Sequence, residues 1–538
     1  MANTMKFGNG QWATKKDSIL AYNDENANFK PLPFVTSRAS TATRVNKLGL
    51  IETVASGIPR VDYLSNTSGA YLLEPQSTNL IAQSESFGSS YWTKSGSSIE
   101  GDASTAGGEQ VVNGDFATDT DWTKGAGTTI SGGKANFSSA TPVALYQTIG
   151  LSSGNVLVSF SVTNYTSGTL NAYVGLSQGV GTINVSANAT GTYTFQMNLD
   201  GGNSNIIFGS SNSFIGSIDN VSVKEVSGFS APIADAPLGA FKLVEGTSTG
   251  SHFMYSSNIA VTLGTVYSSF VFAKKGENSL IQLTYGSGTF NDSYANFDLN
   301  LGTVLLENNS TATIEPLANG YYKCSITATC ATSGNNQLVQ SLINSSTSAR
   351  LESYTGDGTS GVYIFGAQLE AQSYATSYIK TSGSQITRLS DTASQTVPDG
   401  IIGQTEGVLF IEASSLVNGA DNRITLSGGS SSNRVSIEFD ANANTIKGFM
   451  GSNGFLQTTS YNQTNNLKIA LNYKANDFKM FINGVKIGTD TTATISTGIN
   501  RLDFSNYNGD VPFYGNTKDI RVYNTALTDA ELAKLTKI

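Results

Sequence analysis

The sequence is poor in the side chains on which most catalytic and metal sites depend. It contains one histidine, His252, and two cysteines, Cys324 and Cys330, in 538 residues. A Ser-His-Asp arrangement would have to use that histidine, and neither a GxSxG elbow nor a GxxxxGKS/T phosphate loop occurs. The histidine also lies too far along the chain from the cysteines to form a zinc-ligand pattern with them. We therefore expect His252 to be an ordinary strand residue, and the protein not to be an enzyme.

The two cysteines are expected to be buried free thiols. They lie six residues apart in an alternating run whose inward positions would be 322, 324, 326, 328 and 330. Six residues of strand span about 20 Å, which is well beyond the reach of a disulfide. The sequence therefore offers no disulfide framework, although its composition otherwise resembles that of secreted proteins.

Charged residues are also scarce. They make up 13% of the chain, the net charge is −9, and no more than two Lys or Arg are adjacent. Nucleic-acid binding needs a basic patch, so this function is not expected.

No run approaches the length of about 18 apolar residues that membrane insertion needs. The N-terminus shows no signal-peptide core. An extracellular-type protein without export signal or disulfides has few expected locations, and one of them is a virus particle, made in the host cytoplasm and released by lysis.

What the chain does contain is glycine, small polar residues and aromatic rings. There are 56 Gly, 26 Phe and 23 Tyr, and so many rings can be buried only in real cores. Apolar residues alternate with polar ones in stretches such as NVLVSFSVTNY and GYYKCSITATC, bounded by Gly, Asn or Ser. Because the chain is too long for one core, we predict an all-β, multidomain protein of jelly-roll or β-sandwich modules.

An internal repeat is the most informative feature of the organisation. SFGSSYWTKSGSSI at 86–99 and DFATDTDWTKGAGTTI at 115–130 share a Phe, a Trp-Thr-Lys and an Ile at similar spacing. Trp92 and Trp122 hold equivalent positions, so both are expected in cores.

The repeat sets the expected domain boundaries. Its second copy begins before the first has gathered enough strands for a sandwich, so one jelly roll is expected inside another. The expected parts are an irregular docking segment at 1–78, an outer jelly roll at 79–104 and 227–390, an inserted jelly roll at 105–226, and a C-terminal sandwich at 391–538.

Residues 1–78 differ from the rest of the chain in composition and in hydrophobic alternation. They contain clustered prolines, alternate weakly, and include a basic stretch with Arg38, Arg44 and Lys47 in an otherwise acidic chain. Proline removes a backbone donor and is excluded from helix interiors and central strands. We expect this segment to order only on a partner, with its positive side chains against an acidic surface.

The C-terminal part contains two strong local patterns. Asn483-Gly484 predicts a type I′ hairpin turn between two strands. Thr528 followed by Glu531 fits a capping box that opens a short helix, with Leu532 on its apolar face.

Three resemblances rest on these residues. LKIALNYKANDFKMFINGVKIGT followed by DIRVYNTALTDAEL resembles a laminin-G or concanavalin-A-like lectin and glucanase sandwich, over about 391–538. NGDF…W at the start and IDNVSV or YIFGAQLE at the end resemble carbohydrate-binding-module jelly rolls. FVTSRASTATRVNKLGLIETVASGIPRVDY and GAYLLEPQSTNLI resemble fibre, spike and auxiliary virion proteins of tailed bacteriophages, over roughly 30–390. The resemblances imply a virion location and recognition of a glycan.

Glycan recognition needs exposed aromatic rings beside hydrogen-bonding side chains, because ring faces stack on the C–H surfaces of sugars. The candidates lie in turn-rich stretches of the last domain, where a core role is least obvious. They are Phe455, Tyr461, Tyr507, Asn508, Asp510, Phe513 and Tyr514. Packing of each ring on its own domain is the alternative.

Acidic residues raise two further interpretations. Asp115 on the first strand of the inserted module and Asp219 on its last match positions at which jelly rolls often hold a structural calcium ion, although turn acids would look the same. No other cofactor is expected. Glu438 and Asp440 have the i, i+2 spacing of a glucanase acid pair. Because the residues between and before them are apolar and would face inward, we interpret both acids as solvated.

The leading hypothesis is a non-enzymatic virion protein, a fibre or spike. Its N-terminal segment would dock on other virion proteins, and its β modules would bind host-surface glycan. Weak sites need several copies, so a homo-oligomer is expected, with a trimer favoured because phage fibres are commonly trimers. The alternatives are a purely structural decoration protein that contacts only virion neighbours, and a polysaccharide depolymerase.

Overall fold

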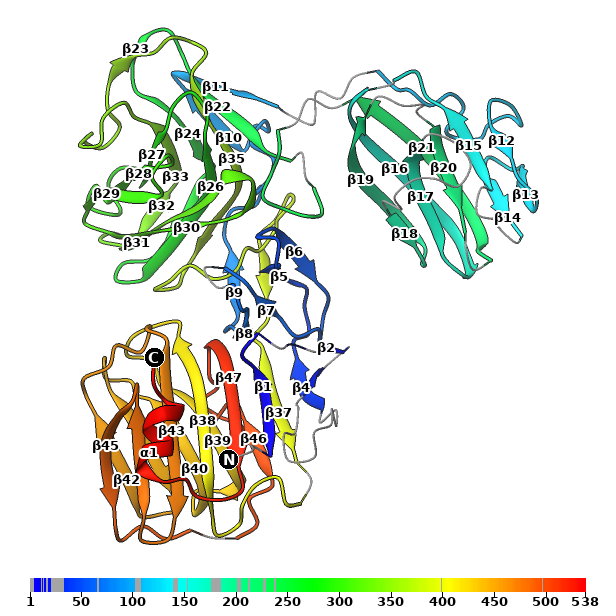
Figure 1. Ribbon diagram of the computed structural model, residues 1–538. Helices are drawn as coiled ribbons and strands as arrows, with labels where there is room; N and C mark the ends of the chain where they lie inside the picture. The colour runs from blue at the N-terminus through cyan, green and yellow to red at the C-terminus, as the bar shows by residue number, and fades with distance from the viewer. Residues whose placement is uncertain are drawn as a thin grey trace.

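The computed structural model describes residues 4–10, 12, 14–15, 18–20, 33–64, 67–101, 108–138, 144–151, 153–175, 185–200, 205–210, 213–225, 229–236, 239–397, 399–495 and 497–538. Nearly all of its elements are β-strands in antiparallel sheets, so the predicted all-β class is confirmed. Figure 1 shows three lobes, which we call the outer, inserted and C-terminal units. Within the described residues, no helix is long and apolar enough to cross a membrane.

The outer unit is a sandwich of two six-stranded sheets. One sheet has the order β10 (Trp92–Ser95), β24 (His252–Ser256), β33 (Leu338–Leu342), β27 (Leu280–Tyr285), β28 (Tyr294–Asp298) and β29 (Thr303–Asn308). The other has the order β11 (Ser97–Glu100), β22 (Phe241–Glu245), β35 (Gly361–Glu370), β26 (Val266–Lys275), β31 (Tyr322–Thr329) and β30 (Thr311–Pro316). Smaller elements are the pairs β23 (Thr249–Gly250) with β34 (Tyr354–Thr355) and β25 (Ile259–Val261) with β32 (Gly334–Asn336), and the 3-10 turn η1 (Ala318–Gly320). The strands β10 and β11 precede the inserted unit in the chain, and all the others follow it.

The inserted unit is a smaller sandwich of two five-stranded sheets. One sheet has the order β12 (Thr123–Lys124), β15 (Leu145–Thr148), β20 (Asn205–Gly209), β17 (Leu170–Gly175) and β18 (Val185–Ala187). The other has the order β13 (Thr128–Ile130), β14 (Ala135–Phe137), β21 (Ile215–Glu225), β16 (Ser153–Ser167) and β19 (Gly191–Asp200). In the described part of the chain these strands pair only with one another, and they enclose a core of their own.

The sequence repeat corresponds to a repeated structural motif. Trp92 and Trp122 are buried, as predicted, and the indole Nε1 of each donates a hydrogen bond to a backbone carbonyl nine residues earlier, at 2.8 and 2.9 Å. Each indole also contacts the repeat's phenylalanine, with centroid distances of 5.0 Å to Phe87 and 5.2 Å to Phe116. The Phe and Trp therefore pack together in the core at the point where the chain enters each of two different sandwiches.

The C-terminal unit consists of an eight-stranded and a nine-stranded sheet. The first has the order β45 (Val485–Asp490), β44 (Phe478–Ile482), β43 (Leu467–Lys474), β38 (Glu406–Ser415), β47 (Gly515–Tyr523), β8 (Ala70–Leu73) and β7 (Val61–Asp62), with β1 (Met5–Gly8) also on β47. The second has the order β2 (Thr14–Lys15), β3 (Ser18–Leu20), β4 (Pro33–Ser37), β37 (Thr392–Thr396), β46 (Arg501–Asp503), β39 (Asn422–Ser430), β40 (Asn433–Phe439), β41 (Ile446–Met450) and β42 (Gly454–Thr458). Two short pairs, β5 (Ala42–Val45) with β6 (Ile51–Val54) and β9 (Ser77–Asn79) with β36 (Ile386–Arg388), lead to the outer unit.

The local patterns of the C-terminal unit fold as predicted. Asn483 and Gly484 both have positive φ, 50° and 83°, which a type I′ turn between β44 and β45 requires. The helix α1 (Asp529–Leu535) begins at Thr528, whose side chain accepts from the backbone N–H of Glu531 in a capping box. Its Leu532 is fully buried against the eight-stranded sheet.

The N-terminal segment does not have the predicted character. Strand β1 pairs with β47 in the register Met5↔Val522, and β4 pairs with β37. The expectation that residues 1–78 are irregular and order only on a partner is therefore wrong for their described part. Pro33 is tolerated because it is the first residue of a strand. Figure 1 shows these dark blue strands beside the red and yellow strands of the C-terminal unit.

The cysteines and the histidine are structural. Cys324 and Cys330 are buried free thiols, and burial raises the pKa of Cys324 well above its ordinary value. His252 is fully buried on β24, where its Nε2 lies 3.1 Å from the carbonyl oxygen of Tyr354 and its Nδ1 contacts the carbonyl of Gly96. The predictions that the cysteines are buried free thiols and that His252 is an ordinary strand residue are confirmed.

Candidate functional site

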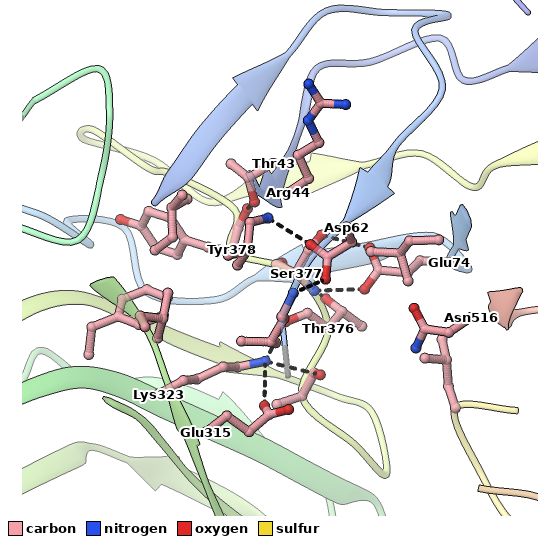
Figure 2. Close-up of a pocket in the computed structure, with 18 residues that line it drawn as sticks. Thr43, Arg44, Asp62, Glu74, Glu315, Lys323, Thr376, Ser377, Tyr378 and Asn516 are labelled. Atoms are coloured by element: carbon pink, nitrogen blue, oxygen red, sulfur yellow. Dashed lines mark hydrogen bonds and ion pairs between the residues drawn. The ribbon is translucent and has the colours of Figure 1, made fainter. Parts of the chain in front are cut away.

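A cavity lies where the N-terminal segment, the outer unit and the C-terminal unit meet. Its volume is about 150 Å³, and Figure 2 shows Asp62, Glu74, Lys323 and Ser377 around it. Asp62 accepts from two backbone N–H groups, Ser377 donates to Glu74, and Lys323 donates to two backbone carbonyls. Burial raises the pKa of Asp62 to about 6, against those two hydrogen bonds. Because these polar groups are satisfied within the chain, the cavity is a gap in an interface and not a prepared ligand site.

One lining residue, Glu74, belongs to a group of five buried charged side chains, which we call the junction cluster: Arg38, Arg60, Glu74, Arg388 and Asp391. Arg38 Nη1 lies 2.9 Å from Asp391 Oδ1, and Arg60 Nη1 lies 2.6 Å from Glu74 Oε2. Arg60 also pairs with Asp391, and Arg388 with Glu74. Burial alone would raise the pKa of Glu74, but Arg388 and Arg60 outweigh it and hold the pKa at about 2. The cluster ties the N-terminal segment to the chain between the outer and C-terminal units.

The structure shows which of the three predicted docking residues, Arg38, Arg44 and Lys47, are available to a partner. The prediction that Arg38 offers positive charge to a partner is wrong, because the whole residue is only 2% exposed and its guanidinium is committed to the junction cluster. Arg44 is half-buried and pairs with Glu52 at 2.5 Å between Nη2 and Oε1. Lys47 is exposed in the turn between β5 and β6. A docking role for Arg44 and Lys47 stays a prediction.

The predicted calcium residues make only local contacts. Asp115 is exposed and its Oδ1 accepts from the N–H of Ala117, while Asp219 Oδ1 accepts from the N–H of Asn220. Among the residues that the structure describes, no group of three His, Cys, Asp or Glu side chains could hold a metal ion. The contacts fit the alternative interpretation as turn acids, and a calcium ion stays a prediction without a ligand set.

The structure separates the predicted glycan contacts. The prediction is wrong for Phe513, which is 1% exposed and packs in the C-terminal core, because the chain after the exposed loop turns inward there. Tyr461 is half-buried against the same core. Tyr514 is half-buried, and burial raises the pKa of its hydroxyl. Asn508 and Asp510 are exposed and hydrogen-bond to each other at 2.8 Å.

Phe455 and Tyr507 are brought to one face of the nine-stranded sheet. Phe455 on β42 is 46% exposed, and its ring centroid lies 5.3 Å from that of half-buried Phe449 on the neighbouring β41. The guanidinium carbon of Arg434 on β40 lies 4.7 Å from the Phe449 centroid and 5.5 Å from that of Tyr507. Phe455, Phe449, Arg434 and Tyr507 therefore form a continuous row, which we call the aromatic strip.

The alternation of β40 places this strip on the side of the sheet away from the core. Val435 and Ile437 belong to the C-terminal core, so Arg434, Ser436 and Glu438 point to the opposite, outer face. Ser436 pairs in register with Phe449, and Phe449 with Phe455. Arg434 lies two residues before Ser436 on β40, so the strip runs level across β42 and β41 and then diagonally onto β40.

Glu438 and Asp440 lie on the same face but are not solvated, so that interpretation is wrong. They are 4% and 6% exposed because longer cationic side chains cover them. Glu438 pairs with Arg423 at 3.0 Å and with Lys447 at 3.5 Å, and Lys447 also pairs with Asp440. Burial raises the pKa of the Glu438 carboxyl, whereas Lys447 and the Asn442 N–H outweigh burial and lower that of Asp440. Both acids are committed to internal ion pairs.

Sequence reasoning missed two members of the strip, Arg434 and Phe449. The alternation of NRVSIEF and IKGFM does place both on the outward face, and this was the pattern that could have identified them. The pairing of β40 with β41, which brings them together, is not visible in the sequence.

Comparison with known proteins assigns the C-terminal region. Residues 409–533 match the model of the concanavalin A-like lectin/glucanases superfamily. A concanavalin A-like/laminin G domain therefore lies at the C-terminus of the chain. The search of curated proteins found no significant match.

Solved structures give distant similarities. The CBM40 of Ruminococcus gnavus IT-sialidase, bound to α2,3-sialyllactose, has 19% identity and a TM-score of 0.22, covering 25% of this chain and 84% of that one. Domain 4 of AbnA, a GH43 arabinanase from Geobacillus stearothermophilus, in complex with arabinotriose, has 16% identity and a TM-score of 0.23, covering 31% and 81%. Domains LG4-5 of the mouse laminin α1 chain have 11% identity and a TM-score of 0.20, covering 77% and 93%. At such scores none of the three supports an inference about this chain.

Proposed function

We propose that the protein is a non-enzymatic glycan-binding adhesin, and that the aromatic strip is its binding surface. The observation that carries the proposal is the row of Phe455, Phe449, Arg434 and Tyr507 on the outer face of the sheet. The match of this region to a superfamily that includes lectins supports the same function.

The chemistry of the strip suits a sugar ring. The C–H surface of a pyranose stacks on the exposed face of Phe455, and polar side chains alongside provide hydrogen bonds. Asn508 and Asp510, both exposed in the loop of Tyr507, are the nearest sequence neighbours with free capacity for such bonds. A strip this open binds weakly, so useful adhesion needs several copies in one particle.

The resemblance of residues 30–390 to phage fibre and spike proteins extends the proposal to location. The protein would be a virion component, most simply a homo-oligomer, in which the jelly-roll units carry the C-terminal domain toward the host surface. The non-enzymatic part of the proposal is supported by Glu438 and Asp440, because the acids with glucanase-like spacing are both committed to ion pairs.

The ring of Phe455 provides the test. Phe455→Ala should weaken binding to the best ligand from a microbial glycan array by about fivefold, since one stacked ring is worth about 1 kcal/mol. Its effect on thermal stability should be small because the side chain is largely exposed. The matched control is Val485→Ala, an exposed apolar residue on the other sheet of the same unit, which should bind normally.

Equal binding by the Phe455 variant and the wild type would show that the strip is not the binding surface. A protein that retains no glycan at all would favour a purely structural role in the particle. Release of reducing ends from a bound polysaccharide would instead indicate a depolymerase.

A further inference from the structure

Arg434 differs from every other arginine of the chain. Its guanidinium forms no ion pair and donates no hydrogen bond to any described residue, and its Nε is buried without a partner. The other arginines, at positions 38, 44, 60, 350, 388, 423, 501 and 521, each donate to at least one acceptor. Arg434 is thus the uncommitted guanidinium in the described structure.

The cations around Arg434 cannot take its place. Arg423 and Lys447 are both paired with Glu438, and Arg501 is paired with Asp503 at 2.7 Å. Arg434 is half-buried, and burial and the nearby Arg423 lower its pKa. An arginine nevertheless stays charged. The guanidinium is partly desolvated and has no acceptor among the described residues. The free-energy cost of its desolvation is therefore not offset by a hydrogen bond or an ion pair.

The contacts of Arg434 hold its guanidinium beside aromatic rings. The guanidinium carbon lies over the rings of Phe449 and Tyr507, where the positive charge makes cation–π contacts. The N–H donors lie in the plane of the group and point outward from its edge, where they match the two oxygens of an acid group. The exposed ring of Phe455 is the next ring of the aromatic strip, and its centroid lies 5.3 Å from that of Phe449.

We propose that Arg434 is an anion-binding residue of the aromatic strip, and that the glycan bound there is acidic, with a carboxylate or sulfate group on Arg434 and a sugar ring on Phe455. This inference rests on the proposed function, because it names the ligand class of the same surface. A neutral glycan would offer the guanidinium only uncharged acceptors, which form weaker hydrogen bonds with it than an acid group does. Nucleic acid would need a basic patch, which a chain of net charge −9 without basic clusters does not provide.

The test compares each acidic glycan with its own neutralised form. An array carries uronate-containing glycans beside their carboxyl-reduced products, and sulfated glycans beside their desulfated products. The wild type should bind the acidic member of a pair about tenfold to a hundredfold more tightly, and the preference should shrink as ionic strength rises. The pair that shows the preference identifies the acid group as carboxylate or sulfate.

Variants assign the preference to one side chain. Arg434→Gln should remove it, with affinity for the neutralised member changing less than about threefold, while Arg434→Lys should keep part of it because a point charge remains. Lys474→Gln removes the same charge from the exposed face of the other sheet and should leave the preference intact. The wild-type comparison of paired glycans needs no variant. It therefore decides whether the ligand is acidic even if Arg434→Gln is unstable.

The outcomes separate this inference from the proposed function. Equal binding to both members of every pair would overturn the acidic ligand while glycan binding stands. A preference that persists in Arg434→Gln would overturn the assignment to Arg434. No binding to any glycan of the array would overturn both proposals.

Discussion

Replacing Glu74 by glutamine is expected to lower the free energy of unfolding by about 3–5 kcal/mol, the usual effect of removing one partner of a buried ion pair. Glu74 is 2% exposed and accepts from both Arg60 and Arg388. Glutamine preserves the shape but leaves these guanidinium groups with one buried carboxylate fewer. Chemical denaturation followed by intrinsic fluorescence measures the change. Glu406→Gln, which removes the partner of the exposed Lys474, should cost about 1 kcal/mol or less.

The same carboxylate gives a second readout in the pH dependence. The pKa of Glu74 is lowered from 4.5 to about 2 in the folded protein, so the folded state holds the charged form more firmly than the unfolded state does. Its stabilisation is complete above pH 4.5 and is lost as the pH falls toward 2. This part of the acid sensitivity should be missing in Glu74→Gln. If that variant is as stable as Glu406→Gln, the junction cluster does not hold the units together.

Trp122→Ala should destabilise the inserted unit by about 3–5 kcal/mol, because it removes a large buried ring and leaves a cavity. Its indole is 7% exposed, packs on Phe116 and Phe208, and donates to a backbone carbonyl. Differential scanning calorimetry should show one transition lowered by roughly 10–20 °C. The transitions of the other units should not move, because the described strands of the inserted unit pair only with one another.

Trp92→Ala is the matched variant of the other repeat copy. It should lower the transition of the outer unit and leave that of the inserted unit in place, since Trp92 lies in the outer core. A common shift of all transitions in either variant would mean that the units unfold as one, and that the repeat does not mark two separate cores.

Features with short-range causes were predictable from the sequence. Alternation indicated the strands, Asn483-Gly484 the hairpin turn, and Thr528 with Glu531 the helix start, because the interacting groups lie within a few residues of each other. The N-terminal segment was not predictable in this way. Met5 pairs with Val522, and no local pattern shows a partner at the opposite end of the chain.

Burial of polar residues was also beyond a one-dimensional pattern. Arg38 was expected to face an acidic partner because it lies in a basic stretch of an acidic chain, yet Asp391, 353 residues away, provides its counter-charge. Glu438 and Asp440 were expected in solvent because they alternate with core residues. Alternation gives the face of a sheet but does not show that Arg423 and Lys447 on neighbouring strands cover it.

The candidate site was predicted in fragments. The turn-rich context identified Phe455 and Tyr507 as available rings, but the same reasoning wrongly included Phe513, whose loop turns it into the core. The role of Arg434 could be inferred only from the side chains that surround it in the folded sheet. A free guanidinium between aromatic rings is a property of the folded sheet, since three strands and a loop contribute to it.

A crystal structure of the protein with its best array ligand tests the central claim most directly. We expect a sugar ring stacked on Phe455 on the outer face of the nine-stranded sheet, with an acidic group within hydrogen-bond distance of Arg434. Ligand density in the inserted or outer unit, with none on the aromatic strip at saturating concentration, would contradict the account.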